Sequence, residues 1–566
     1  MGNLTVLLSG TSAGGNPGGS RSVLPDDFIG SLKYRLTFSG AAETITRDAS
    51  GTASVSLEEG TWTIEAKAYA PGDTAYATVV GTGSETVTIR AGEHQSVTIK
   101  MYTDPAYEAG LTDIYIRSEA ELRRIGTDFA IDGSKRFHLE RDIVLTQPWT
   151  PIGPDSTNPF KAEFYGNGHR IIISGFADYS AGYLGLFGYT DRAKVENLKV
   201  HCNLGTTPMR NPSVSTPFDP LELTGTTTNI YVGALAGYAY NGSVFDKISV
   251  SGSLVFTSDE NVSLYLGGIA GENHNDSVIR SSHVRADIRG EMNTGRVIVG
   301  GVAGGNHSRT GGGGGIIEKS SFAGLAYGFG STEGFIGGIV GEMFTGAIRD
   351  CYASGNVGAG GDSVTVGGIA GRSNSIERSY AWTKVDAGGE SEVRAGGIAG
   401  DIIGDDDLLS QCYALGTVAG GAVTAYIGGI VGYHSQEPIE YCAALNDIEG
   451  YYSSGISLHG IAGYAVWTPT FRSNFSAADM RITGPSQTPD PDLDGDNTTY
   501  ARAHFKGPSP GAVYGPGSTS LNWNFDAGGN WKFISGYDYP VLSWQKSPPP
   551  DLDDLLAYPE IPESGE

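Results

Sequence analysis

One sequence element recurs nine times between residues 183 and 476. It is an aliphatic or aromatic residue followed by Gly-Gly-Ile-Ala-Gly or a close variant, and its last glycine stands at positions 188, 237, 271, 304, 341, 371, 400, 432 and 463. Successive glycines are 49, 34, 33, 37, 30, 29, 32 and 31 residues apart. A fixed period in this range indicates a repeat protein whose units stack on one another.

Each unit contains short β-type segments. The glycine element is followed by a second element such as Ile348-Arg-Asp-Cys-Tyr352 or Ile376-Glu-Arg-Ser-Tyr380, and a third piece such as Ser363-Val-Thr-Val366 closes most units. No helical pattern lies between them, which disfavours helical repeats, and the units are too short for a four-stranded propeller blade. The sequence therefore predicts an all-β fold built on a parallel β-helix, with rungs about 4.8 Å apart.

Glycine is unusually frequent, at 85 of 566 residues. Because glycine has no Cβ atom, it suits tight corners and backbone positions with a positive φ angle. We therefore expect the repeat glycines to form the corners of each coil, where the chain bends inside a narrow cross-section.

The repeats are predicted to follow two other regions. Residues 1–105 alternate apolar and polar residues in short runs, which predicts a β-sandwich of immunoglobulin-like or prealbumin-like type. Residues 106–182 are expected to form an N-terminal cap and the opening coils. Within them, Ser118 and Glu121 have the spacing of a capping box that begins a short helix.

The repeat region itself is expected to span residues 183–480. Residues 481–546 are predicted to form a loop and an aromatic cap over the last coil, because an uncovered rung exposes apolar core and unpaired backbone. Residues 547–566 contain five prolines and six acidic residues, which predicts a disordered tail.

The repeat units resemble a known family. Gly-Gly-Ile-Ala-Gly together with Ile-x-x-Cys-Tyr-Ala is similar to the GLUG-motif repeats of bacterial surface and adhesin-like proteins, and Trp149-Thr-Pro-Ile-Gly153 is similar to their opening coils. The resemblance covers roughly residues 115–545. It implies a right-handed parallel β-helix on an extracellular protein. GLUG repeats also occur beside a metallopeptidase domain that cleaves immunoglobulin A, but the zinc motif of that domain, His-Glu-x-x-His, is not found in this sequence.

The net charge of the chain limits the classes of partner that it can bind. Lys and Arg number 37 and Asp and Glu 63, which gives a net charge of −26 and disfavours nucleic acid and anionic membranes. No run of apolar residues is long enough for a transmembrane helix. The start of the sequence lacks the features of a signal peptide, so we expect a cytosolic start or a mature chain. The resemblance favours the second, with a cell-surface location and a lipid anchor outside this sequence.

Three cysteines, Cys351, Cys412 and Cys442, occupy the same position in their units, where other units have Leu, Ile or Ser. We expect an inward column of small side chains, since cysteine is among the most buried residues. Cys412 and Cys442 lie on neighbouring coils, so a disulfide is conceivable. Parallel stacking holds their Cβ atoms slightly too far apart, which favours free thiols.

A short acidic segment is the candidate metal site. Asp490, Asp492, Asp494 and Asp496 alternate with other residues, and Gly495 follows Asp494, as in the first half of a calcium-binding loop. The bidentate glutamate that such a loop needs is replaced by Ala501. The alternative is an acidic surface loop that binds no ion, and no other cofactor is expected.

For function, the sequence predicts a monomeric, non-catalytic surface protein that binds a host, glycan or neighbouring-cell ligand through a rigid β-helix. One alternative is a carbohydrate-active enzyme, either a polysaccharide lyase or a glycoside hydrolase. Such an enzyme would need converging carboxylates, and the acidic run 405–407 has no evident partner for that role. The other alternative is a structural spacer in a surface assembly. No catalytic residue is predicted, and the insertion 205–229 is a candidate binding loop.

Overall fold

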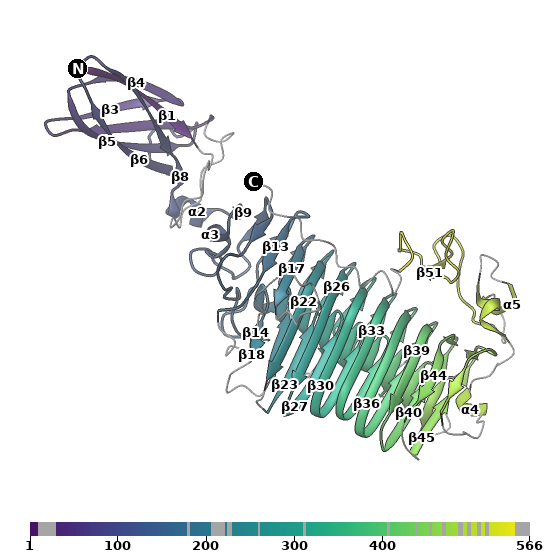
Figure 1. The fold of residues 1–566 in the computed structure, drawn as a ribbon. Helices are drawn as coiled ribbons and strands as arrows, with labels where there is room; N and C mark the ends of the chain where they lie inside the picture. Colours follow the sequence, from purple (N-terminus) through teal and green to yellow (C-terminus); the bar gives the residue numbers. More distant parts are fainter. Residues whose placement is uncertain are drawn as a thin grey trace. The chain divides into compact units, whose positions relative to one another are not determined.

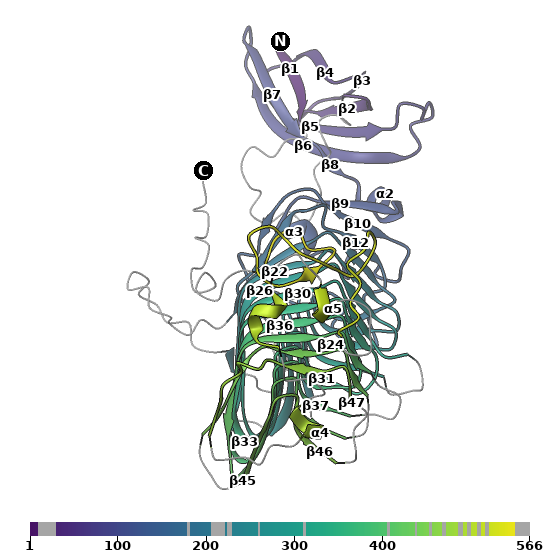
Figure 2. The same cartoon turned by 90° about the vertical axis from the view of Figure 1, so that its right-hand side faces the viewer.

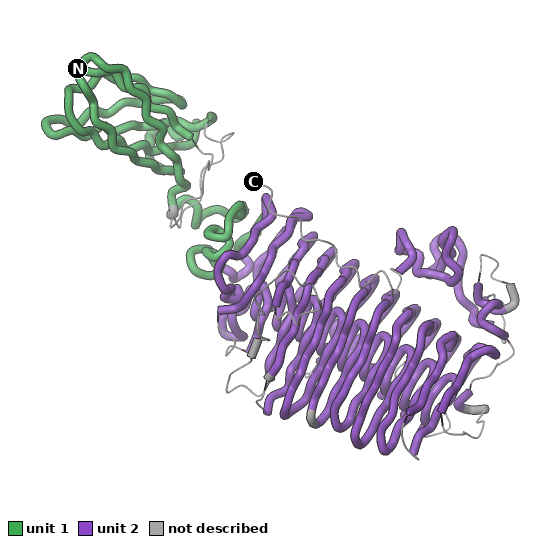
Figure 3. Tube along the Cα trace, in the orientation of Figure 1, with its two compact units in different colours: residues 1–130, 134–138 green, residues 131–133, 139–566 purple. Residues whose placement is uncertain are grey.

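Strands make up 59% of the chain and helices 4%, and the large sheets are parallel, which confirms the predicted β-helix fold. The computed structural model describes residues 1–9, 30–177, 182–204, 221–222, 229–258, 261–308, 313–403, 408–435, 438–451, 455–466, 471–484, 491–494, 500–506, 511–514 and 520–549. The chain has two structural units, residues 1–130 with 134–138, and residues 131–133 with 139–566 (Figure 3).

The first unit contains the predicted sandwich. One sheet has the order β4 (Thr52–Leu57), β1 (Gly2–Ser9), β7 (His94–Lys100), and the other has the order β3 (Thr44–Ala49), β2 (Lys33–Ser39), β5 (Gly60–Tyr69), β6 (Val79–Ile89), β8 (Tyr102–Thr103). Alternate residues of both sheets, among them Leu4, Leu36 and Ile64, share one buried core. The pairing is antiparallel except between β1 and β7, which are parallel.

The same unit continues with α2 (Pro105–Gly110), β9 (Asp113–Ile116) and α3 (Glu119–Leu122). The predicted capping box is present at the start of α3. The Ser118 hydroxyl accepts a hydrogen bond from Glu121 N at 3.2 Å, and the Glu121 carboxylate accepts one from Arg117 N at 2.6 Å. These bonds satisfy backbone donors that a helix leaves unpaired at its beginning.

The second unit is a stack of coils, each of which pairs with the coils before and after it (Figure 1). One face carries a short strand from each coil: β12 (Glu163–Tyr165), β16 (Lys194–Glu196), β21 (Val244–Asp246), β25 (Val278–Arg280), β29 (Ile316–Glu318), β32 (Ala347–Arg349), β35 (Ile376–Glu377), β38 (Leu409–Ser410), β42 (Ile439–Glu440) and β47 (Phe471–Arg472).

A second face carries the strands that follow the glycine element: β15 (Phe187–Asp191), β20 (Ala236–Tyr240), β24 (Ala270–His274), β28 (Ala303–His307), β31 (Val340–Met343), β34 (Ala370–Ser373), β37 (Ala399–Ile402), β41 (Val431–His434) and β46 (Ala462–Ala465). Equivalent residues of successive units are in register, for example Ala270 with Ala303.

The third sheet is the largest. It contains β11 (Ile143–Val144), β13 (Arg170–Ile173), β14 (Tyr183–Leu184), β17 (Lys199–Leu204), β18 (Leu221–Glu222), β19 (Asn229–Gly233), β22 (Ser249–Ser258), β23 (Val262–Gly267), β26 (His283–Met292), β27 (Gly295–Gly300), β30 (Ser321–Gly337), β33 (Tyr352–Gly367), β36 (Tyr380–Gly396), β39 (Tyr413–Gly421), β40 (Thr424–Gly428), β43 (Ala443–Ala444), β44 (Asp447–Gly450), β45 (Gly455–His459), β48 (Phe475–Ser476) and β49 (Ile482–Thr483).

In the middle coils this sheet folds back on itself. The first part of β30 pairs with β26 and its last part with β27, with a shift of register between Gly330 and Glu333. The two parts face each other, because a Cβ placed on Gly328 would lie 2.8 Å from the side chain of Ile336. Each middle coil therefore has a narrow two-layered arm, with β33 and β45 labelled on it in Figure 2.

A second corner follows the short strands. Its first residue has a positive φ angle in nine successive coils, although it is never glycine: Asn197, Lys247, Ser281, Lys319, Asp350, Arg378, Gln411, Tyr441 and Ser473. The next residue points inward and forms the predicted column of small side chains. The hydroxyls of Ser282 and Ser379 accept hydrogen bonds from the backbone N of Ile248 and Cys351, the inward residues of the preceding coils.

Cys351, Cys412 and Cys442 belong to this column and are buried, free thiols, as expected. Each thiol points to a backbone carbonyl two residues earlier in the chain, at 3.2 to 3.3 Å. Burial raises the pKa of Cys351 to about 12. These thiols therefore pack as small apolar groups and are not activated nucleophiles.

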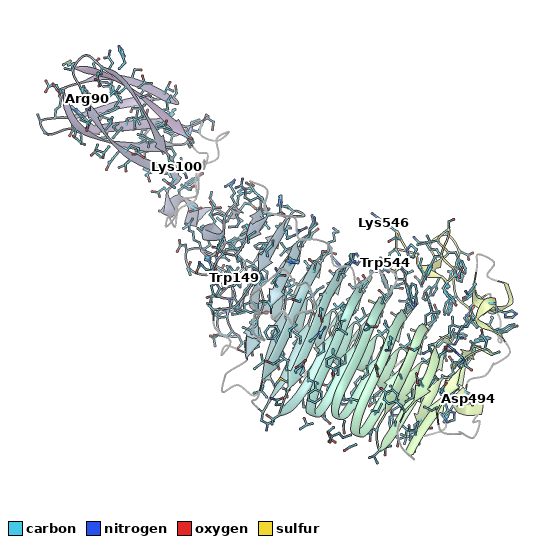
Figure 4. All side chains as sticks on the ribbon, viewed as in Figure 1. Arg90, Lys100, Trp149, Asp494, Trp544 and Lys546 are labelled. Carbon is cyan, nitrogen blue, oxygen red and sulfur yellow. The ribbon has the colours of Figure 1, made fainter. Side chains whose placement is uncertain are left out.

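The predicted aromatic cap extends further than expected. It lies along the outer side of several coils, where Tyr352, Tyr380 and Tyr413 stack in a column with ring centroids 5.2 and 4.8 Å apart. Trp544 stacks on Tyr352 at 5.8 Å, and Figure 4 shows it beside the middle coils. The tyrosine column presents apolar rings outward, and the C-terminal segment buries them. Its regular elements are η1 (Arg502–Phe505), α5 (Gly511–Tyr514), β50 (Trp531–Lys532) and β51 (Val541–Leu542).

Candidate functional site

The glycine element forms a bend between the third sheet and the strand that follows. In the central coils its first glycine has no room for a side chain, because a Cβ on Gly367 would lie 2.1 Å from the carbonyl oxygen of Ala370. In the last coil His459 takes this position. Its second glycine stacks on the equivalent glycine of the next coil, and a Cβ on Gly368 would lie 2.1 Å from the oxygen of Gly397. In the described coils these glycines lack positive φ angles. The repeat glycines therefore form a corner, as expected, and close contact between backbones explains them rather than a positive φ angle.

At this bend the outer faces of the two strands turn towards each other. The side chains that fill the angle form two columns, which together we call the seam. The first column is Tyr183, Tyr231, Tyr265, Ile298, Phe335, Thr365, Arg394, Tyr426 and Ser457. The second column is Tyr189, Tyr238, Glu272, Gly305, Glu342, Arg372, Asp401, Tyr433 and Tyr464.

The N-terminal part of the seam consists of tyrosines. Tyr183 and Tyr231 stack with centroids 5.6 Å apart, and Tyr189 and Tyr238 stack at 4.9 Å. The two pairs meet edge to face, with Tyr231 and Tyr238 at 5.0 Å. Burial raises the pKa of Tyr189. The rings therefore pack as neutral aromatic groups, while Tyr183 and Tyr238 remain partly exposed.

The middle of the seam is a buried ionic network. The Glu342 carboxylate accepts hydrogen bonds from Arg296 Nη2 at 3.0 and 3.2 Å and from Arg372 Nη1 at 3.3 Å. Asp401 Oδ2 accepts one from Arg394 Nη1 at 2.7 Å and lies 3.5 Å from Arg372 Nε. The carboxylates are at most 1% exposed, whereas the three arginines are 21 to 31% exposed. The guanidinium groups thus separate the buried acids from solvent.

A histidine extends this network to the preceding coils. His307 Nδ1 lies 2.8 Å from Glu272 Oε1, and its Nε2 lies 3.9 Å from Glu342 Oε2. Gly305 makes room for this contact, because a Cβ there would lie 2.1 Å from the Glu272 carboxylate. Two glutamates on different coils are therefore linked through one imidazole.

The Glu342 and Asp401 carboxylates each lie beside two guanidinium groups, and Arg372 is shared by both. Burial raises the pKa of Asp401, although the positive charges of Arg394 and Arg372 oppose that shift. Burial disfavours the charged form of Arg296, but Glu342, Tyr265 and Glu333 together outweigh this and raise the arginine pKa. Asp401 Oδ1 accepts no hydrogen bond from the described residues. A buried pair of this kind is costly to break, because the remaining charge is left without a partner.

The C-terminal part of the seam is the most exposed. Tyr426 and Tyr464 lie 4.9 Å apart, and Tyr433 contacts both rings at 5.5 and 5.4 Å. The Arg394 guanidinium covers the Tyr433 ring at 4.0 Å. Tyr464 is 39% exposed. Aromatic and cationic groups therefore reach solvent at this end of the seam.

Of the predicted calcium ligands, only Asp494 has a described side chain. It belongs to α4 (Pro491–Asp494), and its Oδ1 accepts a hydrogen bond from Gly460 N at 3.0 Å and lies 3.3 Å from His459 Nδ1. Leu493 O accepts a bond from Ile461 N, so α4 continues the pairing beyond the last glycine bend, at the end of the stack in Figure 4. The side chain of Asp492, and Asp490 and Asp496 as a whole, lie outside the described residues.

The remaining sequence predictions concern two loops, metal binding and membrane-spanning segments. The acidic run 405–407 lies outside the described residues, as does most of the insertion 205–229. Among the described residues, no group of three or more His, Cys, Asp or Glu side chains is arranged to hold a metal ion. No helix in the described part of the chain is both long and apolar enough to cross a membrane.

Comparison with known proteins gives structural similarity only. No family model and no curated protein matches the chain. A solved structure from Bacteroides ovatus, described as a candidate immunoglobulin A1 protease, matches with a TM-score of 0.32 and 15% identity over 76% of this chain and 92% of that chain. A structure named IgA1 Protease matches with a TM-score of 0.31 and 14% identity over 80% of this chain and 29% of that chain.

The names of both structures contradict the expectation that the chain is non-catalytic, because both name a protease. At this level of similarity the matches concern the fold and assign neither a substrate nor a catalytic residue. Sequence reasoning also missed the seam. Glu272, His307 and Glu342 stand in three different units, and only the register between coils brings them together.

Proposed function

We propose that the chain is a bacterial cell-surface protein that binds an extended glycan along the seam. The observation that carries the proposal is the seam itself, in which aromatic rings and guanidinium groups follow one another from coil to coil. Such a surface is built before the ligand arrives, so binding orders few side chains. The resemblance of the repeats to GLUG proteins supports the surface location.

The chemistry of the seam suits a sugar chain. Aromatic rings such as Tyr464 offer flat apolar faces to the C–H groups of a sugar ring. The guanidinium groups of Arg372 and Arg394, each 21 to 23% exposed, offer hydrogen-bond donors to hydroxyl oxygens. Because coils repeat about every 4.8 Å, a ligand with a repeating backbone can meet similar groups on successive rungs.

The experiment is a glycan-array screen of the whole chain, followed by calorimetry with the best ligand. The double variant Tyr433→Ala with Tyr464→Ala is expected to bind about tenfold more weakly, since each exposed ring contributes about 0.5–1.5 kcal/mol. Tyr115→Ala is the matched control, because Tyr115 is 46% exposed and belongs to the other structural unit. Unchanged affinity in the double variant would contradict the proposal.

A further inference from the structure

The two-layered arm has two outer faces, and the seam uses only one of them. On the other face the C-terminal segment covers the first residues of the long strands, including Tyr352 and Tyr380. Further along these strands, Asn356 and Lys384 are exposed to solvent. This uncovered part of the face is continuous with the outer side of β30 through the pairing of β30, β33 and β36.

Two aromatic residues lie on this uncovered face. Tyr327 and Phe329 occupy alternate positions of β30, so both side chains leave the same side of the sheet. Phe329 is 42% exposed and Tyr327 is half-buried. An exposed phenylalanine beside a second ring, away from the core and from the C-terminal segment, has no packing role that explains it.

The rings lie over glycines of the next coil. Tyr327 is in register with Gly358, and Phe329 with Gly360. A Cβ on Gly360 would be 2.9 Å from Phe329 Cδ2 and 3.3 Å from the Tyr327 hydroxyl, and a Cβ on Gly358 would be 3.4 Å from the Tyr327 ring. The glycines therefore let both rings lie against the sheet, which leaves the opposite ring faces towards solvent.

Polar groups border the two rings. Glu291 is in register with Phe329 on one side, and Asp386 is in register with Gly358 on the other. Burial raises the pKa of Tyr327, and the negative charges of Glu291 and Asp386 add to that shift. The surroundings of the rings thus offer hydrogen-bond acceptors, but their charges are mixed, because Arg289 is in register with Tyr327 and Lys384 Nζ lies 3.9 Å from Asp386 Oδ2. The net charge of −26 of the whole chain disfavours an anionic ligand.

We propose that Tyr327 and Phe329 form a second glycan-binding platform, which takes a neutral polysaccharide. The two ring faces would stack on successive sugar rings, and Glu291, Asp386 and Asn356 would accept hydrogen bonds from the sugar hydroxyls. The inference shares the class of ligand with the proposed function, but it concerns the opposite face of the arm. A protein with both sites would hold two glycan chains at once.

The test uses the chain with the seam double variant, Tyr433→Ala with Tyr464→Ala, so that binding at the seam is weakened. Its migration is measured by native gel electrophoresis in gels containing a soluble β-glucan, xyloglucan or galactomannan, with polygalacturonate as the anionic comparison. We expect retardation by at least one neutral polysaccharide and none by polygalacturonate. Adding Phe329→Ala is expected to weaken the neutral interaction about tenfold, which corresponds to the contribution of a stacked ring.

Two glycine variants provide matched controls. Gly360→Ala introduces a Cβ that tilts Phe329 away from the sheet, and it should weaken binding although both rings are still present. Gly388→Ala makes the same change at the equivalent position of the next coil, where the nearest atom is 3.9 Å away, and it should leave binding unchanged. The proposal is overturned if no neutral polysaccharide retards the seam variant, or if Phe329→Ala and Gly360→Ala migrate as it does. Both results would leave the proposal of glycan binding at the seam unchanged.

Discussion

The substitution Gly368→Ala tests the explanation of the repeat motif. Its Cβ would lie 2.1 Å from Gly397 O, 2.6 Å from the Ala381 Cβ and 2.7 Å from the Thr383 hydroxyl. Real Cβ atoms essentially never approach closer than 3.0 Å, so the two coils would have to separate by about 1 Å at the bend. The backbone on both sides belongs to continuous sheets and cannot yield easily. We therefore expect a loss of about 3–5 kcal/mol in the free energy of unfolding.

The assay is urea denaturation followed by tryptophan fluorescence, with Gly388→Ala as the matched control. That control also adds one methyl group to a strand glycine of a central coil, but into open space. It should leave stability unchanged or raise it by up to about 1 kcal/mol, since alanine restricts the unfolded chain. If Gly368→Ala unfolds at the same urea concentration as the unaltered chain, contact between the backbones does not explain the motif.

Two further predictions concern titratable groups. Burial would raise the pKa of Asp447, but hydrogen bonds from Arg481 and Arg502 outweigh it and lower the pKa. The stabilisation is therefore present above the unfolded-state pKa, near 4, and lost as the pH falls through the lower folded-state value. Asp447→Asn should cost about 1–3 kcal/mol at pH 7 and less at pH 3 in urea titrations, and an equal cost at both would refute the ion-pair explanation. The Cys351, Cys412 and Cys442 thiols should react with a thiol reagent at pH 8 only after unfolding, and labelling of the folded chain would contradict their burial.

Much of the fold of this repeat protein can be predicted from its sequence. The spacing of the glycines is visible because each bend brings backbones into contact, and most units keep glycine there, with exceptions such as Ala234 and His459 in the outer coils. The column that contains Cys412 and Cys442 is visible for a similar reason, since the interior of the central coils has small groups at that point. Both features depend on contacts between residues that occupy equivalent positions in their units.

The seam and the course of the C-terminal segment cannot be predicted from the spacing of the repeats. Tyr352, Tyr380 and Tyr413 were recognisable as recurrent aromatics, but nothing in their spacing shows whether another segment covers them. Glu272 and Glu342 stand opposite His307 only because their coils are in register and the bend turns both outer faces together. Sequence periodicity defines which residues point outward, whereas the angle between adjacent strands determines which outward residues meet.

The bend also determines how such a protein can gain or lose units in evolution. Its geometry depends on backbone contact alone, so a duplicated or deleted unit preserves the angle at every remaining rung. Gain of one unit would lengthen the seam by about 4.8 Å without disturbing its neighbours. The outward residues of that unit, such as those equivalent to Glu272, would then be free to diversify. The length of the seam and the side chains that it presents can therefore change in separate genetic events.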